Sequence, residues 1–144
     1  MKKLSLITLL ILIGIQFIPM DVPADLPTKA EDKLEAPENI QAILKRACFD
    51  CHSSHTTFPW YSSIAPVSWF TKMHVKEGRE HLNFSTWASY DDEKKIKYLQ
   101  KIPKAIKSKM PMPSYLLIHK EAELSDADKA TLTEWAESAG FDLE

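Results

Sequence analysis

The chain has no excess of basic residues, little glycine and almost no cysteine. Its 144 residues include 18 basic and 20 acidic side chains, three glycines and two cysteines, and the formal net charge is −2. No basic stripe alternates with aromatic residues, so the sequence argues against nucleic acid as the main partner. Hydrophobic residues make up 44% and charged residues 26%, which is typical of a folded protein, and the length supports one small domain.

Long alternation of apolar and polar residues, the pattern of a half-buried strand, is also absent. Apolar residues recur instead at helical spacing. The pattern predicts a first helix from Pro37 to the cysteines and a second from Pro66 through Glu77. A third begins near Asp91; Pro103 should kink or end it, and a short helical piece should follow to Lys109. The last helix has its N-cap at Ser125 and ends at Gly140. The predicted fold class is all-α.

The N-terminal residues 1–20 differ from this domain. Lys2 and Lys3 precede an apolar run from Leu4 to Ile18, which is the layout of a secretory signal. The run is shorter than the roughly 17–25 residues of a spanning helix, but no small-residue cleavage site follows it. We favour an uncleaved membrane anchor over a cleaved signal peptide. Either one predicts an exported domain in the periplasm or cell envelope.

Residues 21–37 are rich in proline, alanine and charged side chains and show no apolar periodicity. They predict an extended, solvated tether between the N-terminal segment and the domain at residues 38–144.

The two cysteines lie in RACFDCHSSH, Arg46 to His55. A disulfide between positions i and i+3 would close a very small loop, which constrains the unfolded chain little. A thioredoxin-like pair should follow a strand, and none is predicted. Zinc would need Cys48, Cys51, His52 and His55, of which two are adjacent in the chain, and no second ligand pair supports it.

A c-type haem uses every residue of this motif, because C-x-x-C-H is its attachment signature. On a helix or tight turn Cys48, Cys51 and His52 share one face. The two thiols can therefore form thioethers to the vinyl groups while the imidazole points at the iron. We expect one covalently bound haem c, with Phe49 and Asp50 pointing elsewhere and free to vary.

A second axial ligand would come from a methionine or a histidine. The candidates after the motif are Met73, His74, His81, Met110, Met112 and His119. Met110 is our first choice, because it lies in the proline-rich loop KSKMPMPSY between two helices. Met112 is the alternative within that loop, and in another interpretation both methionines fill gaps in the core.

Other side chains could complete the haem pocket. His74 shares a helix face with Gly78, which would let a flat group approach, so it is an alternative ligand or a pocket-edge residue. Arg79 could hold a haem propionate or lie solvated on the surface. Three tryptophans, Trp60, Trp69 and Trp87, could form pocket walls or ordinary core.

Three segments resemble the haem-binding domain family of bacterial envelope proteins, relatives of the small monohaem c-type cytochromes. They are CFDCHSSHTTFPWYSSIAPVSWF, HVKEGREHLNFSTW and MPMPSYLLIHKEAELSDADKATLTEWA, and the resemblance as a whole covers the chain from about Ile40 to Ala139. The resemblance implies a helical domain with haem c on Cys48 and Cys51 and with His52 as the proximal ligand. The family's usual M-P-P-W-x-Y aligns Met110 and Tyr115 with its methionine and tyrosine, whereas Met112-Pro113 replaces Pro-Trp.

The expected function is single-electron transfer by a cytochrome c-like domain in the bacterial envelope, with other envelope redox proteins as partners and the N-terminal segment as membrane contact. No nucleotide-binding loop or catalytic dyad is visible, so we do not expect an enzyme. The alternatives are a haem-based sensor with an open or displaceable sixth site, and a structural domain without haem.

Overall fold

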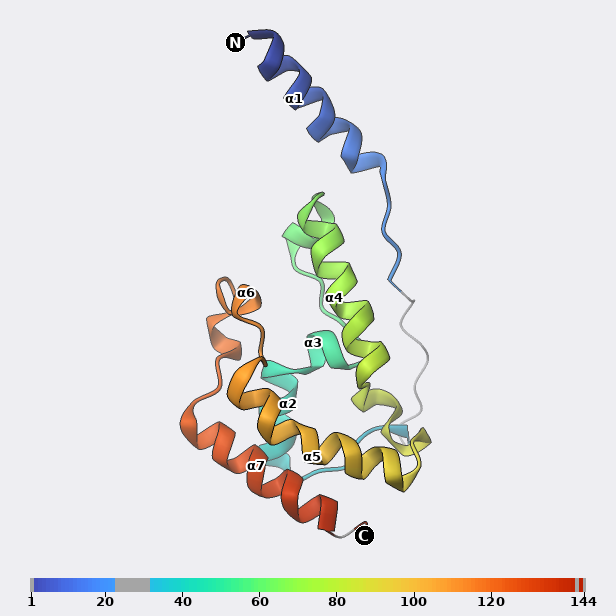
Figure 1. Ribbon diagram of the computed structural model, residues 1–144, viewed down its shortest axis with the longest axis vertical. Helices are drawn as coiled ribbons and strands as arrows, with labels where there is room; N and C mark the ends of the chain where they lie inside the picture. The colour runs from blue at the N-terminus through green and yellow to red at the C-terminus, as the bar shows by residue number, and fades with distance from the viewer. Residues whose placement is uncertain (1, 23–31, 142, 144) are drawn as a thin grey trace.

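The computed structural model describes residues 2–22, 32–141 and 143, and these residues form helices, turns and loops without a strand (Figure 1). The all-α prediction is therefore confirmed for the described part of the chain. In order, the elements are α1 (Lys2–Gly14), η1 (Ile15–Phe17), α2 (Glu38–Ala47), α3 (Phe49–His52), η3 (Trp60–Ser63), α4 (Val67–His81), η4 (Phe84–Ser89), α5 (Asp92–Ser108), α6 (Pro113–Leu116), η5 (Lys120–Ala122) and α7 (Asp126–Phe141), where η marks a 3₁₀ helix.

The helices are arranged along the long axis of the molecule. Helices α5 and α7 pack against each other at one end, and α2 joins them there. The short helix α3 links this bundle to α4 and η3, which lie toward the other end, and α1 projects beyond them (Figure 1). The segment that contains both cysteines therefore lies in the middle of the domain.

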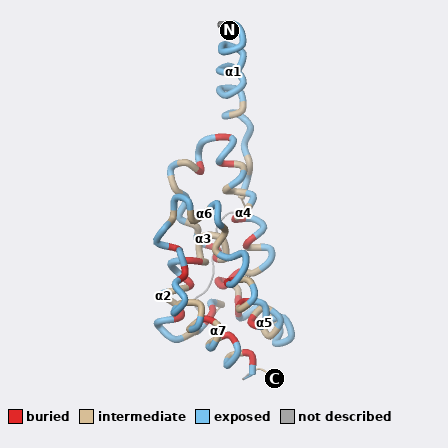
Figure 2. The backbone as a smooth tube through the Cα atoms, turned by 60° about the vertical axis from the view of Figure 1, so that its left-hand side comes forward, coloured by how far each residue is buried: buried red, intermediate tan, exposed pale blue. Residues whose placement is uncertain are grey.

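The core follows from the apolar faces of the three bundle helices. Their buried residues include Ile40 and Leu44 from α2, Leu99, Ile102 and Ile106 from α5, and Leu132 and Ala136 from α7. Figure 2 shows the buried stretches of the chain in red. Phe84 and Trp87 of η4 belong to the same cluster. Full burial of one such large apolar side chain contributes about 1.5–3 kcal/mol, so the amphipathic pattern of these helices sets their packing.

The predicted helix starts are confirmed. The carboxylate of Asp91 accepts a hydrogen bond from the backbone N–H of Lys94 at 2.8 Å, which caps α5. At α7, the hydroxyl of Ser125 accepts from the N–H of Asp128 at 3.1 Å, and the Asp128 carboxylate accepts from the N–H of Ser125 at 2.9 Å. Each pair satisfies backbone donors that have no partner within the helix.

Of the two outcomes predicted at Pro103, a kink or a helix end, the end is wrong, and so is the predicted helix end at Gly140. Helix α5 continues through Pro103 to Ser108, because the buried side chains Ile102 and Ile106 hold both sides of the proline in the core and offset its missing hydrogen bond. Helix α7 includes Gly140 and ends at Phe141. Gly140 is buried there against Leu99, so it serves packing and not chain termination.

The predicted solvated tether is wrong at its C-terminal end. Leu34 is buried in the core cluster, its N–H donates to the carbonyl of Phe84 at 2.9 Å, and its own carbonyl accepts from the Gln41 side chain at 2.7 Å. The packed domain therefore begins before residue 38. Most of the remaining tether, residues 23–31, lies outside the described residues.

The apolar N-terminal segment forms α1 and η1, with its large hydrophobic side chains exposed. Within the part of the chain that the structure describes, no helix is both long and apolar enough to cross a bilayer. The end of this segment contacts the domain. The Gln16 amide donates to the Ala65 carbonyl at 3.0 Å and accepts from the Ala65 N–H at 2.9 Å, and the Trp69 indole donates to the carbonyl of Ile18 at 3.0 Å.

Candidate functional site

The CFDCH motif forms its own helical turn and does not continue α2. Helix α2 ends at Ala47, Cys48 departs from helical geometry, and α3 follows directly. The N–H groups of Cys51 and His52 both donate to the carbonyl of Cys48, at 3.2 and 2.9 Å. This turn keeps the two cysteines and the histidine together, and both cysteines are free thiols.

The ring of His52 is oriented by a backbone carbonyl. Its Nδ1 lies 3.0 Å from the carbonyl oxygen of Leu82, which can only accept, so Nδ1 carries the proton and Nε2 keeps its lone pair. Burial lowers the pKa of His52, although hydrogen bonds to the backbone oppose this effect. The histidine is therefore held in the neutral form that binds a metal ion, with one nitrogen available.

Helix α4 passes over the motif at Gly78. A Cβ atom on this glycine would lie 2.5 Å from the backbone oxygen of Cys51 and 3.1 Å from its carbonyl carbon. The flat group that approaches Gly78 is therefore the Cys51 peptide. The motif is held against α4 by contact that no other residue type permits.

A cavity of about 300 Å³ lies beside the motif. It is lined by Ala47, Cys48, Asp50, Cys51 and His52, by His74, Glu77, Gly78 and His81 of α4, and by Met110, Pro111, Met112 and Tyr115. A second cavity of about 340 Å³ shares Cys48, His52, His81 and Met110 with the first. It continues toward α5 between apolar side chains that include Leu82, Phe84, Ile102 and Ile106.

Four of the predicted ligand candidates line these cavities. Met110 and His81 line both, whereas Met112 and His74 line the first. The Nδ1 of His74 donates to the carbonyl of Phe70 at 2.7 Å, which leaves its Nε2 available just as at His52.

The other predicted pocket residues lie elsewhere. Met73 is not among the lining residues, and both ring nitrogens of His119 are engaged, by Tyr61 at 2.6 Å and by Glu121 at 3.0 Å. None of the three tryptophans lines either cavity: Trp60 is exposed, Trp69 bonds to Ile18, and Trp87 is buried in the core. The interpretation of these tryptophans as pocket walls is wrong.

The zinc alternative would need its four side chains in one cluster. No group of three or more histidine, cysteine, aspartate or glutamate side chains that could hold a metal ion occurs among the described residues. His55 is exposed, whereas Cys48 and Cys51 are partly buried.

Comparison with known proteins bears directly on this cavity. The model of a family described as a haem-binding domain matches residues 10–138 of the chain. The chain belongs to the haem-binding domain family. No curated protein and no solved structure was found to match.

The residues of this haem-binding domain fit the group that the family binds. The two cavities have volumes in the lower part of the range for ligand pockets, about 300–1,000 Å³, and they adjoin through shared residues. Their walls are mainly apolar and include two thiols, one oriented imidazole with an available Nε2, and the thioether of Met110. Apolar walls with a few convergent donors suit a porphyrin with an iron centre.

Asp50 has a role that sequence reasoning missed. Its carboxylate accepts a hydrogen bond from the hydroxyl of Tyr115 at 2.7 Å, which ties the motif to the loop that contains both methionines. Burial and the hydrogen bond to Asp50 raise the pKa of Tyr115, so the phenol stays protonated and donates. Phe49 packs its ring 5.7 Å from that of Phe84. Both side chains therefore make contacts that the sequence prediction for these positions did not include. The alignment of Tyr115 with the family's tyrosine was a signal for the contact with Asp50.

The loop after the motif is held by polar side chains. Arg79 donates to the carbonyl of Ser53 at 2.8 Å and to the hydroxyl of Thr56 at 3.0 Å, so its guanidinium supports this loop, and it does not line either cavity. The buried amide of Asn83 donates to the Ser54 hydroxyl at 2.9 Å. The interpretations of Arg79 as a propionate ligand and as a solvated side chain both lack support.

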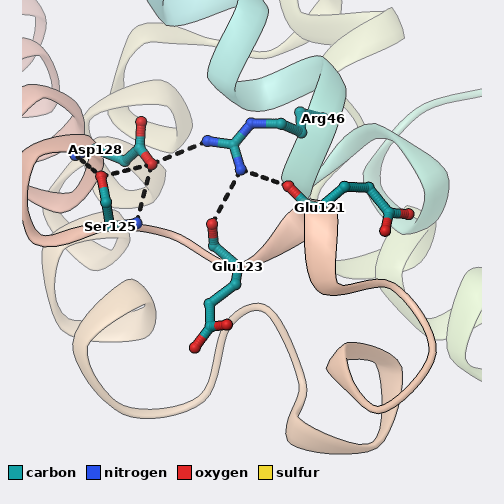
Figure 3. A network of polar contacts seen from close by, with 5 residues as sticks. All are labelled: Arg46, Glu121, Glu123, Ser125 and Asp128. Carbon is teal, nitrogen blue, oxygen red and sulfur yellow. Dashed lines mark hydrogen bonds and ion pairs between the residues drawn. The ribbon is translucent and has the colours of Figure 1, made fainter.

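Arg46, two residues before Cys48, clamps α2 to the chain that follows the methionine loop (Figure 3). Its guanidinium donates to the carbonyls of Glu121 and Glu123 at 2.6 and 2.9 Å and to the carboxylate of Asp128 at 2.9 Å. Burial alone would raise the pKa of Asp128, but hydrogen bonds from Ser125 and Arg46 outweigh it and lower this pKa. Because the pKa is lower in the folded state, this carboxylate stabilises the fold above its ordinary pKa and ceases to do so in stronger acid.

Replacing Arg46 with methionine should lower the free energy of unfolding by about 1–2 kcal/mol at neutral pH, because three hydrogen bonds are lost while the apolar stem is kept. Urea unfolding monitored by circular dichroism gives this value. The matched control is Lys45→Met, which replaces the neighbouring exposed cation on α2. The difference between the two variants should shrink as the pH falls through the lowered pKa of Asp128. Equal losses at neutral pH would show that the clamp contributes nothing.

Proposed function

We propose that this haem-binding protein is a monohaem c-type cytochrome that carries single electrons in the bacterial cell envelope. In this proposal Cys48 and Cys51 hold the haem covalently, His52 is the proximal ligand and Met110 is the sixth ligand. The observation that carries it is that the oriented imidazole of His52 and the thioether of Met110 line the same two apolar cavities.

The protein's own residues position and shield such a group. When bound, haem supplies the one-electron iron couple. The Leu82 carbonyl fixes the tautomer and direction of His52, and the bond between Tyr115 and Asp50 keeps the methionine loop next to the motif. The apolar walls exclude water, and a histidine–methionine pair favours the reduced state relative to histidine alone.

The proposed location rests on the N-terminal segment. Lys2 and Lys3 followed by the exposed apolar helix suit export and attachment to the inner membrane. Partners would be other envelope redox proteins that approach the open side of the cavity, where His81 and Met110 are exposed. We assign no substrate and no catalytic reaction to the site.

A second candidate function is ligand sensing, and the geometry of His74 favours it. This histidine lines the first cavity with Nε2 available. If Met110 does not hold the iron, or leaves it readily, His74 could hydrogen-bond a small ligand in the sixth position.

Met110→Ala should remove the weak sulfur-to-iron absorption band of the oxidised protein and allow the reduced protein to bind carbon monoxide. It should also lower the reduction potential by on the order of 100 mV, a fraction of the ~0.8 V that axial ligands span, because a ligand that favours reduced iron is lost. Absorption spectra and a redox titration measure these changes. Met73→Ala is the matched control, since Met73 is 39% exposed and Met110 is 38% exposed, but Met73 lines neither cavity.

Three outcomes would contradict this assignment. If Met112→Ala has the predicted effect and Met110→Ala does not, the second methionine is the ligand. If only His74→Ala alters the oxidised spectrum, the iron is held by two histidines. If the unaltered protein binds carbon monoxide readily, the sixth position is open or displaceable and the sensor replaces the electron carrier.

A further inference from the structure

Besides residues 82–90, whose Phe84 and Trp87 are buried in the core, two segments of nine or more residues in the domain contain no charged side chain, although charged residues make up 26% of the chain. They are residues 56–71, which include η3 and the start of α4, and residues 110–118, which include α6. The two segments meet in space. Phe58, Val67 and Phe70 of the first line one groove together with Met112 and Ile118 of the second.

The same end of the domain receives the apolar N-terminal helix. Both backbone groups of Ala65 bond to the amide of Gln16, and the Trp69 indole bonds to the carbonyl of Ile18. Helix α1 projects from this end along the long axis, whereas α5 and α7 lie at the other end (Figure 1). Three uncharged segments, 4–20, 56–71 and 110–118, therefore converge at one end of the molecule.

The domain's own part of this end is apolar and exposed. We call it the apolar cap, and it consists of Phe58, Trp60, Ile64, Val67, Phe70, Leu117 and Ile118. Trp60 is 78% exposed and Leu117 is 75% exposed. These two and Ile64 do not line the cavities or the groove, so haem bound beside the motif would leave them exposed.

Of the four charged residues that bound the two segments along the chain, Asp50 is acidic and the other three are basic. Lys72 follows the first segment, and Lys109 and Lys120 stand on either side of the second. Exposed Trp and Leu in segments that lysines bound along the chain suit the boundary between acyl chains and phosphate headgroups: the apolar side chains would enter the boundary and the ammonium groups would reach the phosphates.

We propose that the apolar cap rests on the surface of a lipid bilayer, next to the point where α1 enters it. This inference rests on the envelope location in the proposed function, and it assigns the membrane contact to the folded domain as well as to α1. Lipid is favoured over a protein partner because the cap is continuous with an apolar helix docked at the same end. One consequence is a fixed distance between the haem cavity and the membrane, since the groove beneath the cap shares His74, Met112 and Tyr115 with that cavity.

The test uses the full-length, haem-loaded protein bound to vesicles of phosphatidylcholine and phosphatidylglycerol. Hydroxyl-radical labelling with mass spectrometry should show Trp60 and Leu117 protected about tenfold relative to Phe141, which is 78% exposed at the opposite end of the domain. The variant Trp60→Glu/Leu117→Glu should bind these vesicles about tenfold more weakly, because two apolar side chains no longer enter the bilayer. Phe141→Glu is the matched control and should bind like the unaltered protein.

The proposal is overturned if Trp60 and Leu117 are labelled as heavily as Phe141 on vesicles. It is also overturned if the same protection occurs without lipid and disappears on dilution, since a second copy then covers the cap. Protection on native membranes but not on protein-free vesicles would likewise replace lipid with a membrane protein. The haem spectrum distinguishes failure of this proposal from failure of the proposed function. If the apolar cap is protected by lipid but the haem carries no electrons, only the proposed electron-transfer function is contradicted.

Discussion

Replacing both Cys48 and Cys51 with serine should abolish covalent retention of haem. A thioether requires a sulfur atom on each side chain, and a serine hydroxyl does not replace it in the addition to a vinyl group. Burial raises the pKa of Cys48 to about 12 and that of Cys51 to about 11, so both thiols are protonated at neutral pH. Both line the first cavity. His52 remains in the variant, but one axial bond does not survive denaturation of the chain.

The measurement is a haem stain on a denaturing gel after expression with the c-type maturation machinery. The unaltered chain should stain and the double variant should not, while each single variant keeps one thioether and should stain weakly. His55→Ala is the control, because this exposed histidine would be a ligand only in the zinc alternative. Colour that leaves the unaltered polypeptide on denaturation would refute covalent attachment and leave haem binding itself intact.

Replacing Gly78 with alanine should lower the free energy of unfolding by about 2–3 kcal/mol. The added Cβ would lie 2.5 Å from the backbone oxygen of Cys51, and 3.1 Å from both its carbonyl carbon and its Cβ. A backbone group cannot rotate away as a flexible side chain can, so α4 must separate from the motif. Because His52 belongs to the motif, and both the motif and α4 line the first cavity, the haem absorption should change together with stability.

Gly140→Ala provides the control for Gly78→Ala. Both glycines are buried within helices, but a Cβ at Gly140 would come no nearer than 3.9 Å to the Cβ of Leu99, which is an ordinary contact. Alanine should therefore stabilise α7 by about 0.5–1 kcal/mol through the lower entropy of the unfolded chain. Urea unfolding of both variants gives the comparison. If the two substitutions have the same effect, the close approach of α4 to the motif plays no part in stability.

Much of the fold could be read from local patterns. The starts of α2, α4, α5 and α7 follow from proline, aspartate and serine at their first turns, and these effects depend only on residues a few positions apart. The ends were harder to predict. Proline and glycine favour the end of an isolated helix, but here Pro103 and Gly140 each lie within a helix that buries one apolar face, and this burial outweighs the local preference.

The candidate site divides in a similar way. The C-x-x-C-H spacing and the proline-rich methionine loop are visible in the sequence, and the structure places both around one cavity. The hydrogen bonds that support the site were not predicted. Tyr115 donates to the carboxylate of Asp50, Arg79 to the carbonyl of Ser53, and Arg46 to the carbonyls of Glu121 and Glu123. For the tryptophans the sequence predicted a contact with the cavity that the structure does not have. The presence of aromatic residues does not by itself indicate which helix face lines the cavity.

By itself the sequence determined the helical class, the two thiols and imidazole on one turn, and the charge-free segments at 4–20, 56–71 and 110–118. These properties depend on composition and on spacing of a few residues, which the chain carries whatever its fold. Only the tertiary structure decided that the Leu82 carbonyl orients His52, that Gly78 admits the Cys51 peptide, and that the uncharged segments meet at one end of the molecule. Each of those facts joins residues far apart in the sequence, and their distance is set by how whole helices pack around a common core.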